Sequence, residues 1–418
     1  MHIEVLCTGD ELLTGLIPDT NSPLFMDRVF RRLGQKVERA TVVGDVREDI
    51  TRELRELAGR CDAVLVSGGL GPTSDDLTAE CAATAAGVPL VEDAHALEWL
   101  RARFAQYGRP LTANNAKQAL VPAGAQTVRN PVGTAPMILQ RVGDCTFYFV
   151  PGVPREYRHL VEHEVMPRLA EQVGRLPGRV FRAFRVLKTV GLPESQLDAL
   201  VEPFRAAHSR VTFGFRTDAP ENHLKLLAEG ASQGEADAAL AAAVAACRPA
   251  LAEWFFGADE LTFAEAVGAR LQETGTSVAV AESCTGGLCS EMLTRVPGAS
   301  LWFQAGAVVY QESMKQQWVK VSAATLASRG AVSAETALEM ASGARSECRA
   351  SYGLAVTGYA GPAGGTEEDP VGTFYCALAG PGGTQVQRGR AEGDRDRVRR
   401  FAAYRALELL WRATRGST

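Results

Sequence analysis

The sequence predicts an α/β protein built from more than one domain. Short apolar runs typical of buried strands occupy residues 3–7, 37–43 and 63–66, and helical stretches at residues 27–33 and 77–86 alternate with them. Strands that alternate with helices predict a parallel sheet that is covered by helices. The length of 418 residues exceeds what one core usually organises, so we expect two or three domains.

The middle of the chain carries a weaker pattern. Residues 180–190 and 211–215 resemble strands, and residues 236–254 form a long alanine-rich helical stretch. This combination predicts a small α+β domain between two larger ones. The predicted domains are residues 1–172, 173–256 and 257–418.

The last domain alternates strands and helices again. It opens with a helix near Thr262 and closes with a helix that begins at Arg395. The strand-like runs between them are residues 277–281, 305–310, 353–356, 372–379 and 385–390, with further helices near Ala323 and Ala334. A second α/β domain is therefore predicted.

The composition argues against several classes of protein. Apolar residues make up 46% of the chain and the formal net charge is -5, as in an ordinary soluble protein. No apolar run is long enough to span a membrane, and the N-terminal residues lack the pattern of a signal peptide, so we expect a cytoplasmic protein. The nine cysteines include no Cys-x-x-Cys pair, and no run of basic residues occurs, which disfavours a disulfide framework, a zinc site and a nucleic-acid groove.

A serine in the last domain has the setting of a nucleophile. Residues 281–287 read Ala-Glu-Ser-Cys-Thr-Gly-Gly, and a serine hydroxyl attacks only when a neighbour takes its proton. Because no histidine occurs in residues 257–418, the base for Ser283 is expected among lysine, tyrosine and carboxylate side chains. The candidates considered for this role are Tyr310 and Lys315.

Lysine is rare in this chain. Of the 44 basic residues, the lysines are Lys36, Lys117, Lys188, Lys225, Lys315 and Lys320. Arginine does not lose its proton in a protein, whereas the pKa of a partly buried lysine falls and lets it act as a base. Lys315 is therefore a candidate base, although a solvated position on a helix explains a single lysine equally well.

Two alternatives lie in the same turn. Cys284 is intrinsically the better nucleophile, but it lacks the histidine that would activate it. Glu282 is either a general base or a carboxylate at the start of a helix, and the second interpretation is the simpler one. The backbone N–H groups from Cys284 to Gly287 are expected to stabilise an oxyanion.

The first domain contains a glycine-rich turn where a strand gives way to a helix. Residues 67–78 read Ser-Gly-Gly-Leu-Gly-Pro-Thr-Ser-Asp-Asp-Leu-Thr, and Gly68, Gly69 and Gly71 predict a cradle whose backbone N–H groups bind phosphate. Each aspartate near this turn, taken alone, is equally a helix cap. As a set, the acids at neighbouring strand ends are expected to converge on a metal-bound phosphate, and they are Asp10, Glu11, Asp45, Asp75 and Asp76.

Further motifs extend over nearly the whole chain. The first domain carries Gly-Asp-Glu-Leu-Leu-Thr-Gly at residues 9–15, Asn-Asn-Ala-Lys-Gln-Ala at 114–119 and Pro-Gly-Val-Pro at 151–154, and the last carries Thr-Gly-Tyr-Ala-Gly-Pro at 357–362 and Gly-Asp-Arg at 393–395. Together with the serine turn and the glycine-rich turn, these motifs resemble the competence/damage-inducible protein CinA family. The resemblance implies an N-terminal domain similar to molybdopterin-binding proteins that acts as an ADP-ribose pyrophosphatase. It also implies a KH-like middle domain and a C-terminal nicotinamide mononucleotide amidohydrolase, in a homodimer.

The resemblance also implies roles for residues of the last domain. Ser283 is the expected nucleophile, Tyr310 and Lys315 are the pair that activates it, and Arg395 or a near neighbour, Arg397 or Arg399, binds the phosphate. The other expected substrate contacts are Cys284, Thr285, Gly286, Gly287, Thr357, Gly358 and Gly361. No cofactor is expected for the deamidase.

In the first domain, the resemblance implies that Asp45 and Asp76 are the catalytic acids and that Lys117 contacts phosphate. A divalent cation, magnesium or cobalt, is expected there, with a monovalent cation as an option. Its expected ligands are Glu11, Asp45, Asp75 and Asp76. The expected substrates of the two ends of the chain are ADP-ribose and nicotinamide mononucleotide, with no membrane partner and no dedicated nucleic-acid partner.

One position departs from the family's pattern. Met137 follows Gly-Thr-Ala-Pro at residues 133–136, where the family usually has glycine, and its side chain is expected to crowd the approach of a ligand to the backbone. Two other functions stay open on the sequence alone. One is a non-catalytic adaptor in competence and DNA uptake, and the other is a first domain that only binds a pterin or a nucleotide.

Overall fold

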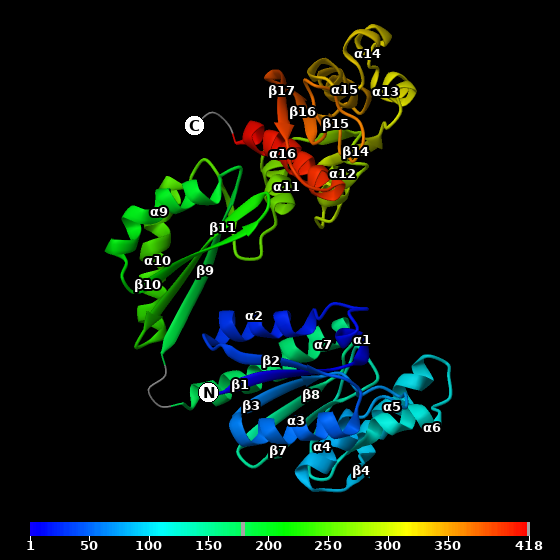
Figure 1. Ribbon diagram of the computed structural model, residues 1–418, viewed down its shortest axis with the longest axis vertical. Coiled ribbons are helices and arrows are strands. Elements are labelled where there is room, and N and C mark those ends of the chain that lie inside the picture. Colours follow the sequence, from blue (N-terminus) through cyan, green and yellow to red (C-terminus); the bar gives the residue numbers. More distant parts are fainter. Residues whose placement is uncertain (177–179, 416–418) are drawn as a thin grey trace. The chain divides into compact units, whose positions relative to one another are not determined.

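The computed structural model describes residues 1–176 and 180–415. It contains two compact units, one of Met1–Ala183 with Glu229–Ala236 and one of Phe184–Ala228 with Asp237–Thr418. Figure 1 shows their helices and strands, with labels where there is room. Among the described residues, no helix has both the length and the apolar character needed to cross a membrane.

A six-stranded sheet lies at the centre of the first unit, in the order β2-β1-β3-β8-β7-β6. The parallel strands are β1 (Ile3–Thr8), β2 (Val37–Val43), β3 (Ala63–Ser67) and β8 (Cys145–Val150), and β7 (Met137–Val142) and β6 (Gln126–Val128) follow in antiparallel pairing. β1 and β3 are buried along their whole length, as expected for strands covered on both faces. The predicted parallel α/β sheet is confirmed.

Helices cover both faces of this sheet (Figure 1). Phe25, Val29 and Leu169 pack beneath one face and Ile50 and Leu54 beneath the other, so that each face has its own apolar core. The helices of the first face are α2 (Asn21–Leu33), α7 (Pro154–Leu160) and α8 (Met166–Gly174), and those of the second are α3 (Arg47–Arg60) and α4 (Thr78–Ala86). The unit also contains α1 (Asp10–Leu13), β4 (Leu90–Glu92), α5 (Ala94–Gln106), α6 (Ala113–Ala116) and β5 (Leu120–Pro122).

The middle of the chain forms a four-stranded sheet in the order β10-β11-β9-β12. Its elements are β9 (Phe181–Val190), α9 (Glu194–Ala207), β10 (Val211–Asp218), β11 (Glu221–Gly230), α10 (Gln233–Ala250) and β12 (Phe255–Ala258). The helix predicted over residues 236–254 ends earlier, because the chain must reach β12. Strand β11 is not predicted by the sequence pattern, because its buried residues include Glu221, Asn222 and His223, polar types that do not signal a buried strand.

The last part of the chain is built on a five-stranded sheet in the order β14-β13-β15-β16-β17. Its strands are β13 (Val278–Glu282), β14 (Phe303–Val308), β15 (Tyr352–Gly358), β16 (Thr373–Gly380) and β17 (Gly383–Arg390). One face packs on α11 (Phe263–Glu273), α12 (Leu288–Thr294) and α16 (Arg395–Thr414), and the other on α13 (Glu312–Val319), α14 (Ala323–Arg329) and α15 (Ala334–Glu347). The first three strands are parallel, so their carboxyl ends share one edge.

Helix α16 packs against the middle segment as well as against its own sheet. Val190 and Phe256 belong to the same apolar cluster as Phe263 and Trp411. The Tyr404 hydroxyl donates a hydrogen bond of 2.9 Å to the Glu221 carboxylate at the start of β11. The second compact unit therefore has a core that is continuous across the two segments.

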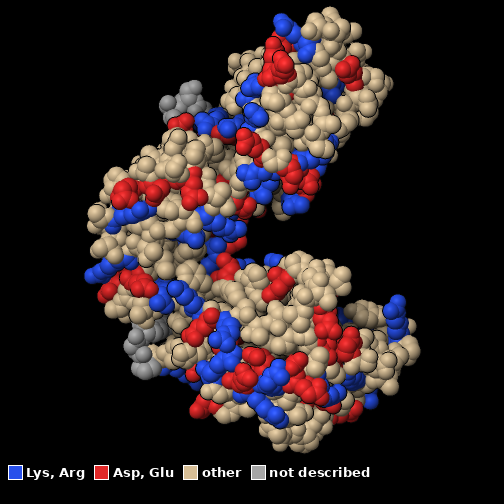
Figure 2. Space-filling model, viewed as in Figure 1, with Lys and Arg blue, Asp and Glu red and all other residues tan. Residues whose placement is uncertain are grey.

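Charged side chains of both signs are interspersed over the face shown in Figure 2. Ion pairs elsewhere in the described residues include Arg60 with Glu4 at 2.9 Å and Arg388 with Asp369 at 2.7 Å. Over the described residues of this face, the picture shows no uniformly basic groove.

The substitution Gly343→Ala tests how closely α15 packs. Alanine in a helix interior normally stabilises by about 1 kcal/mol relative to glycine. At this position, however, the new Cβ would lie 1.8 Å from the carbonyl oxygen of Val319. We expect the free energy of unfolding to fall by about 1 to 3 kcal/mol, measured by urea denaturation. Gly59→Ala in α3 is the control, since its Cβ would meet nothing within 4 Å, and equal stabilisation by both changes would contradict the packing argument.

Candidate active sites

The chain turns sharply at Ser283, between the end of β13 and the start of α12. Gly286 and Gly287 have φ angles of 62° and 96°, a region that L residues with side chains rarely adopt. The Ser283 backbone N–H donates to the carbonyl oxygen of Val356 on the neighbouring strand β15, at 2.9 Å. This turn holds the Ser283 side chain, 9% exposed, at the carboxyl edge of the parallel strands.

Lys315 extends from α13 to the serine. Its Nζ lies 3.0 Å from Ser283 Oγ, 2.8 Å from the carbonyl oxygen of Val309 and 3.1 Å from that of Tyr310. The residue is only 1% exposed. Burial lowers the pKa of the Lys315 amine to about 8, because loss of water disfavours the charged form.

The three neighbours of the amine fix its orientation in the neutral form. A neutral amine has two N–H donors and one lone pair, and the carbonyl oxygens of Val309 and Tyr310 can only accept hydrogen bonds. When both N–H groups bond to these carbonyls, the lone pair is left facing Ser283 Oγ. The geometry is that of a general base that accepts the proton of the serine.

The Tyr310 phenol does not take part in this contact. Its hydroxyl instead accepts a hydrogen bond of 3.1 Å from Arg395, and the side chain is 54% exposed. Tyr310 meets Lys315 through its backbone carbonyl. The expectation of a Tyr310–Lys315 activating pair therefore needs correction, since the carbonyl orients the lysine while the phenol lies on the solvent side of the site.

Cys284 is buried beside the serine. Burial raises the pKa of its thiol to about 12, so the thiol stays protonated near neutral pH and is a weak nucleophile. This favours Ser283 over the cysteine as the attacking group. Cys284 contributes its backbone N–H to the turn.

The predicted oxyanion donors are only partly available. The N–H of Gly286 bonds to the Ser283 carbonyl oxygen at 3.1 Å, and the N–H of Gly287 bonds to the Glu282 carboxylate, also at 3.1 Å. Among the described residues, the N–H groups of Cys284 and Thr285 have no hydrogen-bond acceptor. Of the oxyanion donors expected from Cys284 to Gly287, only the backbone N–H groups of Cys284 and Thr285 are therefore available.

Of the three candidate arginines, one contacts the serine turn and a second contacts Gly361 and Tyr310. Arg395 donates to the Gly361 carbonyl oxygen at 2.7 Å as well as to Tyr310, and Arg399 donates to the Thr285 carbonyl oxygen at 2.9 Å. The two lie four residues apart and so share one face of α16. Arg397 stacks over the Phe401 ring instead, at 5.1 Å from its centroid.

Thr357 and Gly358 pack closely against neighbouring segments. The Thr357 hydroxyl is buried and donates to the Ala331 carbonyl oxygen at 2.7 Å. A Cβ on Gly358 would lie 2.7 Å from the Phe374 side chain. Their expected role as substrate contacts stays a prediction, and the Gly361 carbonyl oxygen accepts a hydrogen bond from Arg395.

The first unit contains a cavity of about 720 Å³ at the carboxyl edge of its parallel strands. This size lies within the usual range of ligand pockets. Its lining brings together the sequence motifs at residues 9–15, 68–78 and 151–154. The polar residues of the lining include Glu11, Asp19, Asn21, Asp45, Ser67, Asp75, Asp76, Gln118 and Glu156.

The glycine-rich turn in this cavity allows close backbone approach. Gly68 and Gly69 have φ angles of 109° and 65°, and a Cβ on Gly69 would lie 2.1 Å from the Thr78 hydroxyl. The N–H of Gly68 is bonded to the Val150 carbonyl oxygen at 3.1 Å, so it does not belong to the predicted cradle. The backbone N–H groups from Gly69 to Gly71 have no acceptor among the described residues and form the remaining anion-binding concavity.

Asp76 and Lys117 hold the turn in shape. One Asp76 carboxylate oxygen accepts both the N–H and the hydroxyl of Thr73. Lys117 Nζ donates to the carbonyl oxygens of Thr73 and Asp76, each at 2.7 Å. Both side chains therefore position the loop, and the expected roles of Asp76 as a catalytic acid and of Lys117 as a phosphate contact stay predictions.

The predicted metal ligands do not form a ready site. Asp45 and Asp10 accept hydrogen bonds from each other's backbone N–H groups, at 3.0 and 3.2 Å. Burial raises the pKa of Asp45, and the negative charges of Asp10, Glu11 and Asp75 add to the effect. Across the part of the chain that the structure describes, no three Asp, Glu, His or Cys side chains are arranged to hold a metal ion. The acids therefore do not fit a metal site made of protein ligands alone.

Glu156 is a cavity residue that the sequence analysis missed. It is half-buried, burial raises its pKa, and one carboxylate oxygen accepts a hydrogen bond of 2.6 Å from Asn130. It follows the Pro-Gly-Val-Pro motif by two residues, so the motif was the signal that could have found it.

Met137 is fully buried in the apolar core. The crowding of the cavity that was expected from its side chain therefore does not occur.

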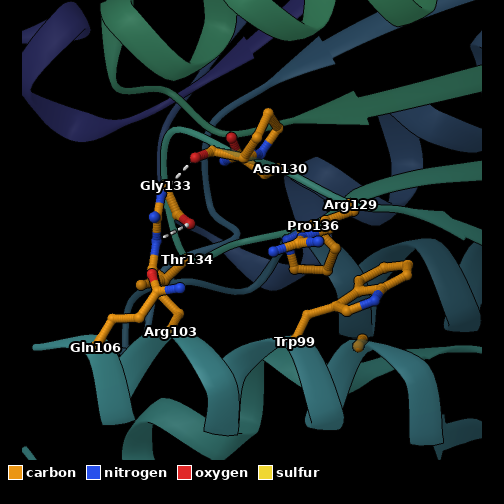
Figure 3. Close-up of a pocket in the computed structure, with 10 residues that line it drawn as sticks. Trp99, Arg103, Gln106, Arg129, Asn130, Gly133, Thr134 and Pro136 are labelled. Atoms are coloured by element: carbon orange, nitrogen blue, oxygen red, sulfur yellow. Dashed lines mark hydrogen bonds between the residues drawn. The ribbon is translucent and has the colours of Figure 1, made fainter.

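A smaller hollow is lined in part by the loop that contains Asn130 and Gly133, and Figure 3 shows the residues around it. Arg103 on α5 donates to the carbonyl oxygens of Pro131 and Gly133, at 2.6 and 3.3 Å, so it holds the loop in place. Asn130 donates to the Ala135 carbonyl oxygen at 3.0 Å. A volume of about 20 Å³ suits a single water molecule, so this hollow is part of the support of the cavity and not a substrate site.

Comparisons with known proteins match all three segments of the chain. Residues 4–171 match a probable molybdopterin binding domain, residues 184–257 the damage-inducible protein CinA KH domain, and residues 260–414 the CinA C-terminal domain. A CinA-like protein of Myxococcus xanthus (strain DK1622) is 55% identical over 98% of this chain and 97% of its own length. A CinA-like protein of Anaeromyxobacter sp. (strain Fw109-5) is 46% identical over 99% of this chain and 100% of its own.

Solved structures cover parts of the chain. A crystal structure of the protein CinA with unknown function from Thermoplasma acidophilum is 34% identical, covers 40% of this chain and 97% of its own, and has a TM-score of 0.38. The molybdopterin biosynthesis enzyme MoaB from Thermus thermophilus is 21% identical, covers 43% and 99% of the two chains, and has a TM-score of 0.30.

The titration of Lys315 can be measured directly, because the chain has only six lysines. We expect the ¹³Cε resonance of Lys315 in lysine-labelled protein to titrate with a midpoint near the pKa of about 8 that burial produces. The spectrum of Lys315→Arg, which lacks this one resonance, provides the assignment. A midpoint above about 10, the ordinary range of lysine, would show that the amine is not desolvated.

Proposed function

The chain belongs to the CinA family, and from this premise we propose that it is a bifunctional hydrolase of pyridine-nucleotide salvage. Its last segment deamidates nicotinamide mononucleotide to nicotinate mononucleotide. Its first domain hydrolyses the diphosphate bond of ADP-ribose. The observation that carries the first activity is the buried Lys315 amine, 3.0 Å from the Ser283 hydroxyl.

The deamidation proceeds through an acyl-enzyme. Ser283 Oγ attacks the carboxamide carbon while Lys315 takes the hydroxyl proton, and a tetrahedral intermediate forms. The intermediate collapses as the C–N bond breaks, and the proton held by Lys315 passes to the nitrogen, which leaves as ammonia. Water then attacks the ester with Lys315 again as the base, and nicotinate mononucleotide and free serine are released.

The surroundings of Ser283 suit a substrate that carries a phosphate. Arg395 and Arg399 lie on one face of α16 and both contact groups at the rim of the serine turn. A guanidinium group binds phosphate through paired N–H donors. The exposed Tyr310 ring stands beside Arg395 and offers an aromatic surface between the serine and the phosphate anchor.

In the first domain, the proposal rests on the cavity of about 720 Å³ and its free backbone donors. The N–H groups from Gly69 to Gly71 suit one phosphate of a diphosphate. Asp45 stands at the same sheet edge with a raised pKa, which suits a group that accepts or holds a proton. Asp45 is therefore the proposed catalytic acid of this domain.

Substitutions at Ser283 and Lys315 should abolish ammonia release from nicotinamide mononucleotide. We expect Ser283→Ala and Lys315→Arg to lower kcat by about 10³-fold or more, because one loses the nucleophile and the other replaces the base with a group that cannot deprotonate. Lys320→Arg is the matched control, since Lys320 lies on the surface. Ammonia is measured in a coupled assay with excess substrate.

The same assay decides between neighbouring nucleophiles. Full activity of Ser283→Ala would reject the proposed site. Loss of activity in Cys284→Ala together with an active Ser283→Ala would instead place the nucleophile one residue later. A rate that does not rise with pH toward about 8, where Lys315 loses its proton, would contradict its role as the base.

A glycine substitution tests the first domain. Gly69→Ala should lower kcat/KM for AMP formation from ADP-ribose at least tenfold, because the new Cβ would lie 2.1 Å from the Thr78 hydroxyl and displace the turn. Gly87→Ala is the matched control, since its φ of 69° resembles the 65° of Gly69 but a Cβ would meet nothing within 4 Å. AMP is measured by chromatography, with magnesium and with a chelator. Wild-type protein that binds ADP-ribose but forms no AMP would indicate a domain that only binds.

A further inference from the structure

Glu282 is a buried carboxylate beside the nucleophile that the proposed reaction does not use. It is the last residue of β13 and is 0% exposed. One oxygen accepts the N–H groups of Gly287 and Cys289, at 3.1 and 3.0 Å. The other accepts the N–H and the hydroxyl of Ser290, at 2.9 and 2.7 Å. A carboxylate out of contact with water is stable only when donors of this kind compensate its charge.

These bonds decide which backbone donors of the turn remain free. The N–H groups that bond to carbonyl oxygens are those of Ser283, Gly286 and Leu288. Those that bond to Glu282 are Gly287, Cys289 and Ser290. Within residues 283–290, all of which the structure describes, the N–H groups of Cys284 and Thr285 are left without an acceptor.

We propose that Glu282 is a positioning residue that shapes an oxyanion hole from the N–H groups of Cys284 and Thr285. The proposal rests on the proposed amide hydrolysis at Ser283. The N–H of the residue after a nucleophile is well placed to stabilise the oxyanion of the tetrahedral intermediate. Glu282 ties the first turn of α12 to the end of β13, so the two free N–H groups keep their direction. The carboxylate itself does not touch the substrate.

The substitution Glu282→Gln keeps the shape of the side chain and tests this role. An amide has one acceptor oxygen, and its NH₂ group would face N–H donors. We expect kcat for ammonia release from nicotinamide mononucleotide to fall about 10- to 100-fold, with KM within about threefold. The pH midpoint of kcat should not move, because Lys315 is unchanged. Glu291→Gln is the matched control, since Glu291 is an exposed residue of the same helix and should keep wild-type kinetics.

A fluorophosphonate probe measures the same hole without relying on the substrate assignment. Ser283 Oγ attacks phosphorus as Lys315 takes its proton, a P–O bond forms, the P–F bond breaks and fluoride leaves. The adduct carries an oxygen where the oxyanion of the intermediate would lie. By intact mass spectrometry, we expect labelling to be at least tenfold slower in Glu282→Gln, unchanged in Glu291→Gln and absent in Ser283→Ala.

The outcomes separate this inference from the proposed function. If the wild type is labelled but releases no ammonia from nicotinamide mononucleotide, the substrate assignment fails and the labelling rates still decide the role of Glu282. Labelling of a folded Glu282→Gln at the wild-type rate overturns the inference, where an unchanged melting temperature shows that the variant is folded. A wild-type protein that is not labelled also overturns it.

If Glu282→Gln does not fold, Glu282→Asp is used, whose shorter side chain withdraws the acceptor oxygens. Slow labelling of that folded variant supports the inference, and a wild-type rate rejects it.

Discussion

The candidate deamidase site depends on the burial of one amine. A lysine in an apolar interior loses the water that stabilises its charge, and every N–H group that stays with it needs an acceptor. The carbonyl oxygens of Val309 and Tyr310 meet that need for two N–H groups. The third direction points to Ser283, so the same burial that lowers the pKa of the amine also aims its lone pair. The chemistry therefore follows from where the chain leaves β14 and enters α13.

The two candidate sites share one structural feature, a glycine-containing turn at the end of a parallel strand, although their sequences differ. In each, a parallel strand ends in a turn that contains glycines with positive φ, Gly68 and Gly69 in one and Gly286 and Gly287 in the other. Backbone N–H groups that helices and strands normally use are left free in both turns. A nearby carboxylate bonds to backbone N–H groups of each turn, Asp76 in the first and Glu282, the last residue of β13, in the second. Both acids thus organise backbone donors, a role that the sequence predicted for Glu282 as the simpler of its two interpretations.

Helix α16 connects the serine site to the rest of the second compact unit. Its first turn carries Arg395 and its second Arg399, both of which contact the site, whereas Tyr404 further along bonds to Glu221 of the middle segment. Glu408 is buried and paired with Arg405 and Arg412, which stabilises the far half of the helix. The position of the arginines at the serine turn consequently depends on packing that involves the middle segment as well as the C-terminal sheet.

The sequence alone determined the α/β fold class through its hydrophobic periodicity and the location of both turns through its glycines. The lack of histidine after residue 256 led to Ser283 with Lys315 as candidates. These features can be read from the chain without its tertiary contacts. It could not tell that β11 begins with buried polar residues, since partners such as Leu192 for Asn222 and Tyr404 for Glu221 come from elsewhere in the fold. Nor could it direct the Tyr310 phenol to Arg395 or Lys117 to the carbonyl oxygen of Thr73. The sequence motifs determine which side chains each site contains. Only the tertiary structure decides which acceptor Arg395 and Lys117 meet, because hydrogen bonds act over about 3 Å, while the partners lie tens of positions apart in the chain.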